Sequence, residues 1–251
     1  MRKPFIAGNW KMNTDSAGAV ALAAGLAKEL SSVDTVDVAV CPPFVYLQSV
    51  AAALSASNVA LGSQNVYFEE KGAFTGEISC AMLKDTSCAY AIIGHSERRH
   101  VLGETDAMIN KKISAAISGG LLPIFCVGEL LEERQGGTTH EVVARQIKNG
   151  LEGICAESIQ AVTVAYEPVW AIGTGLTATP EQAQEVHAMI RGLLADLYGN
   201  EIAQTIRIQY GGSAKPGNTA ELMAQPDVDG LLVGGASLKV EDFAAMVKTV
   251  A

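Results

Sequence analysis

The chain has 251 residues, a formal net charge of −9, 49% hydrophobic residues and only 18% charged residues. This composition provides enough apolar surface for a sizeable core and excludes a disordered chain. The acidic balance argues against sequence-independent binding to nucleic acid, which requires clustered Lys and Arg. Because this length is ordinary for one α/β barrel, we expect a single domain over residues 1–251.

The amino-terminal segment MRKPFIAGNWKMN has one short apolar patch, which Asn9 and Lys11 interrupt. It therefore lacks the apolar core of a signal peptide, and no later stretch approaches the ~20 apolar residues of a membrane-spanning helix. The five cysteines contain no C-x-x-C pair, a pattern that favours reduced thiols over disulfides or a zinc site. We expect a cytoplasmic protein that makes no contact with a membrane.

Eight short apolar runs follow one another along the chain, with longer segments between them. Each run is nearly continuous in β-branched or other apolar residues, as is typical of parallel strands covered by helices on one face and packed inside on the other. The runs are FIAGNW, VDVAVC, VALGS, AYAIIG, LPIFCV, AVTVAYE, IRIQY and DGLLVGG.

The segments between these runs carry helix signals, most clearly after Thr179. A capping threonine, Pro180 at the first helical position and Gln182 predict a helix start there, and Gly199 predicts its end. Eight β/α units in 251 residues predict a closed (β/α)8 barrel. An open, doubly wound sheet of the same units is the alternative that this pattern leaves open.

In a (β/α)8 barrel the chemistry lies at the carboxyl ends of the strands, so the residues that follow the apolar runs are the candidates. Polar or glycine-rich sequence follows several of them. These candidates are Asn9, Lys11, His95, Glu97, Glu167, Gly211-Gly212-Ser213 and Gly234-Gly235.

Glu167 and His95 each have an ordinary structural interpretation, as an exposed strand-end carboxylate and as a hydrogen-bonded core histidine. The sequence after Glu167 favours a functional one, because Pro168 stiffens the backbone and Trp170 can shield the carboxylate from water and make it a base. His95 opens the segment SERRH at the start of a predicted helix, where the helix dipole disfavours a cation. A neutral imidazole there can donate a hydrogen bond to a carbonyl oxygen.

The glycine-rich segments also allow two interpretations. Gly173-Thr174-Gly175 loosely matches a dinucleotide-binding fingerprint, but the helix starts only at Pro180, so a lid is favoured. Gly211-Gly212-Ser213 and Gly234-Gly235 can be plain turns. Because they follow the seventh and eighth strands, where barrels commonly hold phosphate, an anion site is favoured.

Residues 64–78 form a segment too long for a routine barrel connection, and it carries the aromatic residues Tyr67, Phe68 and Phe74. Apolar rings in a loop need cover. The segment either folds back on its own barrel or packs against a second subunit, and the residues themselves do not decide between the two.

The whole chain resembles the triosephosphate isomerase family. The matching motifs are GNWKMN, NVYFEEKGAFTGEIS, IIGHSERR, CVGE, AYEPVWAIGTG, YGGSAKPGN and LLVGGASLK. The resemblance implies a TIM barrel that interconverts dihydroxyacetone phosphate and D-glyceraldehyde 3-phosphate through an enediolate, in glycolysis and gluconeogenesis. It implies no cofactor and no metal, in agreement with four histidines that form no H-E-x-x-H motif.

The resemblance also assigns roles to the catalytic candidates. It makes Glu167 the base that moves the proton and His95 the neutral electrophile. Lys11 stabilises negative charge, Asn9 places the bound oxygen, and Glu97 orders the residues behind them.

By the same resemblance, backbone groups of Gly173, Ser213, Gly234 and Gly235 hold the phosphate. Residues 168–178 form the lid, with Ile172, Gly173, Thr174 and Gly175 at its tip, and Ile172 meets Leu232 on closure. The family is homodimeric, and Thr75 would enter the neighbouring subunit close to Asn9 and Lys11.

One position departs from the family pattern, because Leu176 stands where a lysine often follows the GTG of the lid.

Two other functions are alternatives to the isomerase. A metal-using epimerase or an aminoaldose isomerase would need ligating His and Asp residues or a different acid/base pair. A catalytically silent barrel would be expected to lose Lys11, His95 or Glu167, and all three are present.

Overall fold

The computed structural model describes residues 2–173 and 175–251, and over these residues eight parallel strands close into a barrel. Each strand pairs with the next in chain order, and β1 pairs with β8 through Phe5↔Gly230 to Gly8↔Val233. The closed barrel is confirmed and the open sheet is excluded. The strands are β1 (Phe5–Asn9), β2 (Asp37–Cys41), β3 (Val59–Ser63), β4 (Tyr90–Ile93), β5 (Leu122–Val127), β6 (Thr163–Tyr166), β7 (Ile208–Tyr210) and β8 (Gly230–Val233).

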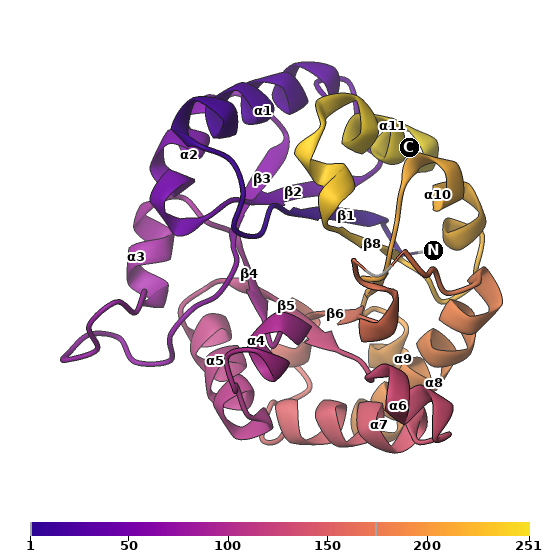
Figure 1. Cartoon of the computed structure of the whole chain (residues 1–251). Helices are drawn as coiled ribbons and strands as arrows, with labels where there is room; N and C mark the ends of the chain where they lie inside the picture. The colour runs from indigo at the N-terminus through magenta and orange to yellow at the C-terminus, as the bar shows by residue number, and fades with distance from the viewer. Residues whose placement is uncertain (1, 174) are drawn as a thin grey trace.

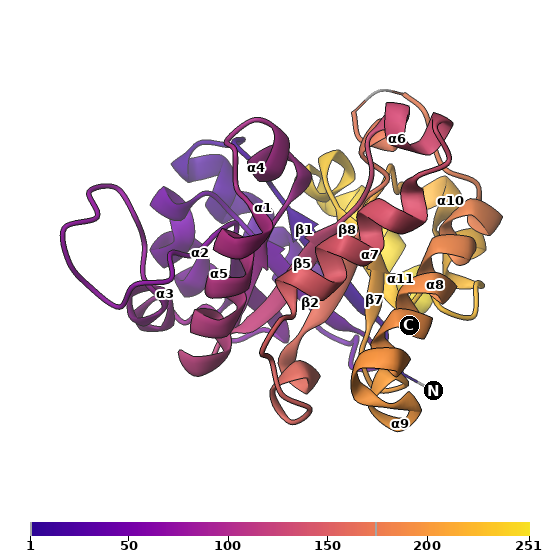
Figure 2. The ribbon, with the colours of Figure 1, turned by 90° about the horizontal axis from the view of Figure 1, so that it is seen from below.

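Helices surround the strands as an outer ring, as Figures 1 and 2 show from two directions. The α-helices are α1 (Ser16–Glu29), α2 (Leu47–Leu54), α3 (Cys80–Asp85), α4 (Ser96–His100), α5 (Asp106–Ser118), α6 (Leu131–Gln135), α7 (Thr139–Gly150), α8 (Pro180–Tyr198), α9 (Asn200–Ala203), α10 (Pro216–Met223) and α11 (Val240–Val250). Short 3-10 helices are η1 (Phe44–Tyr46), η2 (Ser158–Ala161), η3 (Val169–Ala171) and η4 (Gly235–Leu238).

The alternation of side chains along each strand divides the core into two parts. Ile6 belongs to the large cluster between strands and helices, whereas Phe5 and Ala7 belong to a second cluster made of strand residues. Inside the barrel, Phe5 stacks on Tyr90 with 4.7 Å between ring centroids. The barrel is therefore filled with side chains, and a ligand site has to lie at one of its ends.

The helix after the predicted lid has the signals expected from its sequence. The Thr179 side chain accepts a hydrogen bond from the N–H of Gln182, and the Gln182 side chain accepts one from the N–H of Thr179. Gly199 ends α8 with a φ of 86°, which favours glycine. These caps fix where the preceding loop ends.

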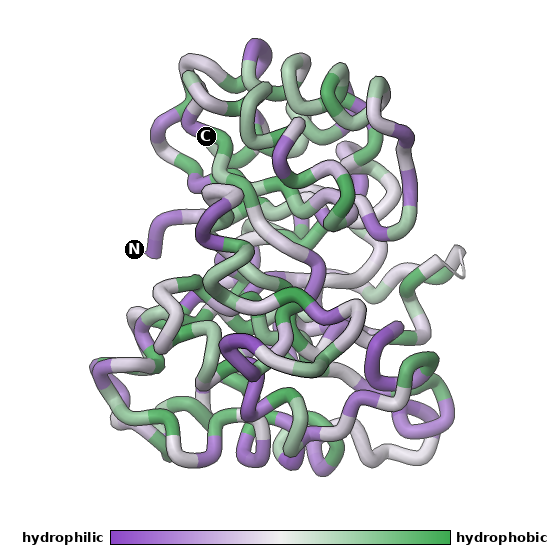
Figure 3. Tube along the Cα trace, turned by 90° about the vertical axis from the view of Figure 1, so that its left-hand side faces the viewer, coloured by the Kyte–Doolittle hydropathy of each residue, from purple (hydrophilic) through white to green (hydrophobic). Residues whose placement is uncertain are grey.

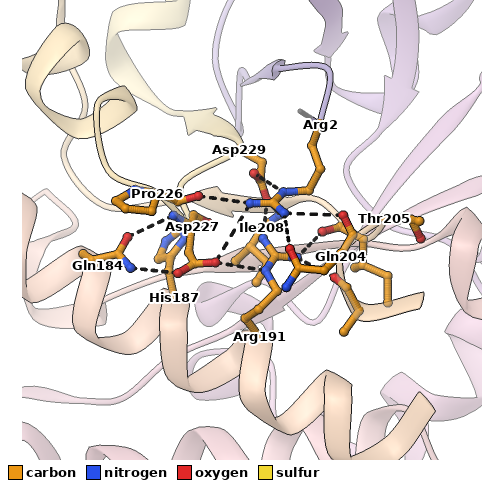
Figure 4. Close-up of polar contacts among 12 residues, drawn as sticks. Arg2, Gln184, His187, Arg191, Gln204, Thr205, Ile208, Pro226, Asp227 and Asp229 are labelled. Carbon is orange, nitrogen blue, oxygen red and sulfur yellow. Dashed lines mark hydrogen bonds and ion pairs between the residues drawn. The ribbon is translucent and has the colours of Figure 1, made fainter. Parts of the chain in front are cut away.

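A network of ion pairs and hydrogen bonds lies at the amino ends of β7 and β8 (Figure 4). Arg191 of α8 donates to the carbonyl oxygens of Ala203 and Ile206 and to both Asp227 and Asp229. These partners lie in the segments that lead into the two strands. Arg191 therefore joins α8 to the end of the barrel opposite the strand carboxyl ends.

The segment 64–78 projects from the barrel between β3 and α3 (Figures 1 and 2). Tyr67 stacks on Phe68 at 4.3 Å and packs near Phe74 at 5.0 Å between ring centroids. Thr75 and Phe74 are exposed, so the tip of the segment does not fold back on its own barrel. Figure 3 views the molecule from the side of Figure 1 on which this segment projects.

Within the described residues, none of the helices combines the length and the apolar character that crossing a membrane requires.

Candidate active site

A cavity of about 310 Å³ opens at the carboxyl ends of the strands. Residues from β1, β4, β6, β7 and β8, or from the loops after them, line it together. Among the described lining residues, Lys11 is the cation and Glu167 is the carboxylate. The lining residues predicted from sequence are Asn9, Lys11, His95, Glu167, Ile172, Gly173, Ser213, Leu232, Gly234 and Gly235.

Glu167 lies directly after β6, and its side chain is only 2% exposed. One carboxylate oxygen lies 2.9 Å from Nε2 of His95, and the other accepts a hydrogen bond of 2.8 Å from the backbone N–H of Ser96. The pKa of Glu167 is lowered, because these donors outweigh the opposing effect of burial. The carboxylate is thus ionised in a site that excludes most water.

His95 caps the amino end of α4, and the hydrogen bonds of its ring assign its proton. Nδ1 accepts from the backbone N–H of Glu97 at 3.2 Å, so in the neutral ring the proton is on Nε2, which faces Glu167. Burial lowers the pKa of His95, but the facing Glu167 carboxylate outweighs burial and the net shift is upward. This upward contribution exists only while Glu167 faces the ring.

Lys11 reaches the cavity from a backbone conformation with a φ of 52°, which is unusual for a residue with a side chain. The side chain of Asn9 accepts from the N–H of Lys11 at 3.0 Å, and Gln64 donates to the Lys11 carbonyl oxygen at 2.8 Å. The Lys11 ammonium lies 2.5 Å from Glu97, whose side chain is half exposed and lies outside the cavity lining. Lys11 is therefore fixed at both its backbone and its head group.

Part of the cavity wall comes from the glycine-containing turns after β7 and β8. Ser213 follows β7, and Gly234 and Gly235 follow β8, at the start of η4. Of the described residues, none would lie within 4 Å of a Cβ added at Gly235, and only the Lys11 side chain, at 3.6 Å, would meet one added at Gly234. The space in front of this wall is open, which suits an anion held by backbone groups.

The predicted lid begins with the short helix η3, and the described residues between η3 and α8 form no helix or strand. Gly173 and Gly175 have φ values of 69° and 84°, a region that favours glycine. Ile172 and Leu232 both line the cavity. The predicted lid residue Thr174 lies outside the described residues.

Sequence reasoning did not identify the contacts that hold the start of the lid. Glu129 is fully buried, and one of its carboxylate oxygens accepts from Tyr166 at 3.1 Å and from Trp170 at 2.8 Å. Burial raises the pKa of Glu129 against the opposing effect of these two donors. The motif CVGE was the signal for Glu129, but its partners come from other elements.

Two glycines leave the space that Glu167 occupies. A Cβ at Gly128 would lie 1.7 Å from the Glu167 carbonyl oxygen, and one at Gly211 would lie 2.9 Å from Glu167 Cγ. Both distances are shorter than a van der Waals contact, so the two positions exclude larger residues at the present geometry. The sequence predicted Gly211 as part of an anion turn and did not predict its contact with Glu167.

A larger cavity of about 540 Å³ lies at the amino ends of β1 and β8, beside Arg2 and Asp229. Its arginine donates to Asp229, Gln204 and Pro226 (Figure 4). The charge of Arg2 is therefore already matched, which disfavours an anion there. Among the described residues, no group of three or more His, Cys, Asp or Glu side chains is arranged to hold a metal ion.

The family model and the known proteins that match this chain are those of triosephosphate isomerase. The family model described as "Triosephosphate isomerase" matches residues 4–250. The chain is 60% identical over 248 residues to triosephosphate isomerase of Carboxydothermus hydrogenoformans, with 99% of each chain covered. It is 56% identical over 247 residues to that of Moorella thermoacetica, with 98% of each covered. It is 54% identical over 248 residues to that of Syntrophotalea carbinolica, with 99% and 98% covered. The protein therefore belongs to the triosephosphate isomerase family.

Proposed function

We propose that this protein interconverts dihydroxyacetone phosphate and D-glyceraldehyde 3-phosphate, the triose phosphates of glycolysis and gluconeogenesis, by proton transfer through an enediolate. Family membership supports the reaction. The observation that carries the mechanism is the buried carboxylate of Glu167, 2.9 Å from Nε2 of His95 in a cavity that Lys11 also lines. One base and one hydrogen-bond donor are sufficient for an enolisation.

In this mechanism Glu167 takes a proton from the carbon beside the substrate carbonyl and returns it to the neighbouring carbon. The electron pair of the broken C–H bond forms the C=C bond of the enediolate, and the carbonyl oxygen gains negative charge. The hydroxyl proton on the carbon that lost its hydrogen then moves to that oxygen, so this carbon becomes the carbonyl of the product when the other carbon takes the proton back from Glu167. His95 donates a hydrogen bond from Nε2 to that oxygen, and Lys11 provides positive charge nearby. Glu167 has to leave the N–H of Ser96, its present partner, to reach a substrate carbon.

The remaining residues position the substrate. Asn9 fixes the backbone of Lys11 and places the bound oxygen, and Glu97 holds the Lys11 ammonium at 2.5 Å. The phosphate rests on backbone groups of Gly173, Ser213, Gly234 and Gly235, where the absence of side chains at the glycines leaves room for an anion.

We infer that residues 168–178 close over the bound substrate as a lid, with Ile172 brought against Leu232. Closure excludes water from Glu167 and from the enediolate, which would otherwise lose its phosphate. The positive φ values of Gly173 and Gly175 and the contacts of Trp170 with Glu129 at the start of the lid support this assignment.

We further propose that two copies of the barrel form a homodimer, with Thr75 of each segment 64–78 inserted beside Asn9 and Lys11 of its neighbour. The exposed tip of this segment supports the dimer. Apolar side chains after β1, β2 and β4 are exposed too, with Met12 96% and Val101 77% accessible. Exposed apolar groups of this kind mark interaction surfaces.

Two further parts of the assignment rest on the same function. Residues 1–251 act as one barrel domain, because the lining of the cavity draws on strands from β1 to β8. The enzyme works in the cytoplasm, where triose phosphates are metabolised. The free state of all five cysteines agrees with a reducing compartment.

A coupled assay with D-glyceraldehyde 3-phosphate tests the proposal. We expect turnover that a chelator does not reduce, and far slower turnover of glyceraldehyde, which lacks the phosphate that the glycine wall is proposed to hold. Loss of activity with the chelator would point to a metal-using enzyme. No turnover at all would favour a silent barrel.

A further inference from the structure

Arg99 of α4 bridges the carboxyl ends of two neighbouring strands. The pairing of β4 with β5 ends at Ile93↔Phe125, so Gly94 and Cys126 form the next pair in register. Arg99 donates from Nε to the carbonyl oxygen of Gly94 at 2.8 Å and from Nη2 to that of Cys126 at 3.0 Å. A guanidinium group therefore joins the two strands at the point where their hydrogen-bond ladder stops.

Each of the two carbonyl groups is linked through the backbone to one member of the proposed catalytic pair, His95 or Glu167. Gly94 directly precedes His95. Cys126 directly precedes Val127, whose carbonyl oxygen accepts from the N–H of Glu167 at 2.7 Å. Through these backbone links, Arg99 is connected to both His95 and Glu167, whose side chains lie 2.9 Å apart.

Arg99 is itself held in one position. Its Nη1 donates to Asp106 at 2.6 Å, its guanidinium carbon lies 6.0 Å from the centroid of the Phe125 ring, and its side chain is 7% exposed. The planar guanidinium has donors in fixed directions, so it can serve three acceptors at once. Lysine has one nitrogen at the end of a flexible chain and cannot reproduce this bridge.

We propose that Arg99 is a positioning residue of the isomerase, which sets the separation of His95 and Glu167 by fixing Gly94 and Cys126. The proposal rests on the proposed roles of those two residues. Arg99 lies outside the cavity lining, and the phosphate wall belongs to β7 and β8. Loss of the bridge should therefore disturb the chemical step more than substrate binding.

The test is Arg99→Lys, assayed per folded molecule. We expect kcat to fall by about tenfold or more while KM stays within about threefold, because a shift of about 1 Å in catalytic geometry can cost two powers of ten in rate. A kcat within threefold of the parent, or a KM that rises as much as kcat falls, would overturn the proposal.

Arg191→Lys is the matched control. Arg191 is also 7% exposed, donates to two carbonyl oxygens and pairs with aspartate, but it lies at the opposite end of the barrel (Figure 4). If loss of a buried arginine acts only through stability, both variants will melt earlier and keep the parent kcat per folded molecule. An equal fall in kcat in both variants would refute a positioning role for Arg99.

If Arg99→Lys does not fold, Asp106→Asn provides a milder perturbation. It removes the carboxylate that holds Nη1 and keeps the arginine and its two carbonyl partners. We expect kcat to fall about two- to fivefold at constant KM, and an unchanged kcat would count against the proposal. Glu167→Gln in the same assay distinguishes failure of the proposed mechanism from failure of the positioning role of Arg99. If that variant is fully active, the proposed mechanism fails, whereas an inactive Glu167→Gln beside a normal Arg99→Lys removes only the role of Arg99.

Discussion

Replacing Glu167 by glutamine removes the proposed base and nearly preserves the volume of the side chain. In the parent, the two carboxylate oxygens accept from Nε2 of His95 and from the N–H of Ser96. A glutamine has one oxygen and one NH₂ group, so one of these two donors will face another donor. A buried donor without an acceptor costs about 1–3 kcal/mol, and the variant should be less stable by that amount.

The effect on the rate is larger. General acid–base catalysis by a placed side chain contributes about 10²–10⁴-fold, which corresponds to roughly 3–5.5 kcal/mol of transition-state stabilisation. We therefore expect kcat of Glu167→Gln to fall within that range. KM should change far less, because the proposed phosphate site at Ser213, Gly234 and Gly235 is untouched.

The same substitution makes a separate prediction about His95. In the parent, the Glu167 carboxylate raises the pKa of His95 above its ordinary value of 6.5, against the opposing effect of burial. Glutamine carries no charge, so burial then dominates and the pKa of His95 should fall. Titration of the histidine ring nitrogens by NMR measures this shift.

The coupled isomerase assay, run on protein shown to be folded, gives the decisive comparison. Glu181→Gln is the control, because Glu181 is an exposed glutamate in the first turn of α8, away from the cavity lining. It should keep the parent rate. A kcat for Glu167→Gln within tenfold of the parent would refute the assignment of Glu167 as the base.

Three further predictions concern the lid, the dimer and the response to acid. Deleting residues 172–176 should slow isomerisation and release methylglyoxal from the unprotected enediolate, and a by-product yield equal to that of the parent would remove the gating role. Thr75→Arg should place an unpaired charge in the proposed subunit contact. At micromolar protein concentration, sedimentation should then show more monomer and the assay should show lower activity. A fully active monomer would contradict the proposed dimer contact. Burial lowers the pKa of His187 to about 4, so the unfolded chain binds a proton between pH 6.5 and 4 that the folded chain does not. Lowering the pH through this window should therefore remove about 3 kcal/mol from the free energy of unfolding, which urea titrations measure. This pH dependence should be lost in His187→Gln and retained in the control His140→Gln, whose residue is exposed.

Much of the fold can be predicted from sequence, because its signals are local. The eight apolar runs contain the eight strands, since a strand buried on both faces needs continuous apolar residues wherever it occurs. Thr179, Gln182 and Gly199 likewise bound α8 by contacts within a few residues. The rule that active sites lie at the carboxyl ends of barrel strands then brings Lys11 and Glu167 to one cavity.

Other features depend on residues that only the closed barrel brings together. The bridge of Arg99 joins carbonyl groups of two strands, and the Glu129 carboxylate meets Trp170, which is 41 residues away in the chain. No local pattern encodes these distances, because they depend on strand register and on the packing of helices outside the barrel. Sequence by itself determined the chemical groups and the barrel end at which they lie, whereas the tertiary structure decided that Glu167 faces His95 and Ser96, because strand register and barrel closure set the separation of β4 and β6.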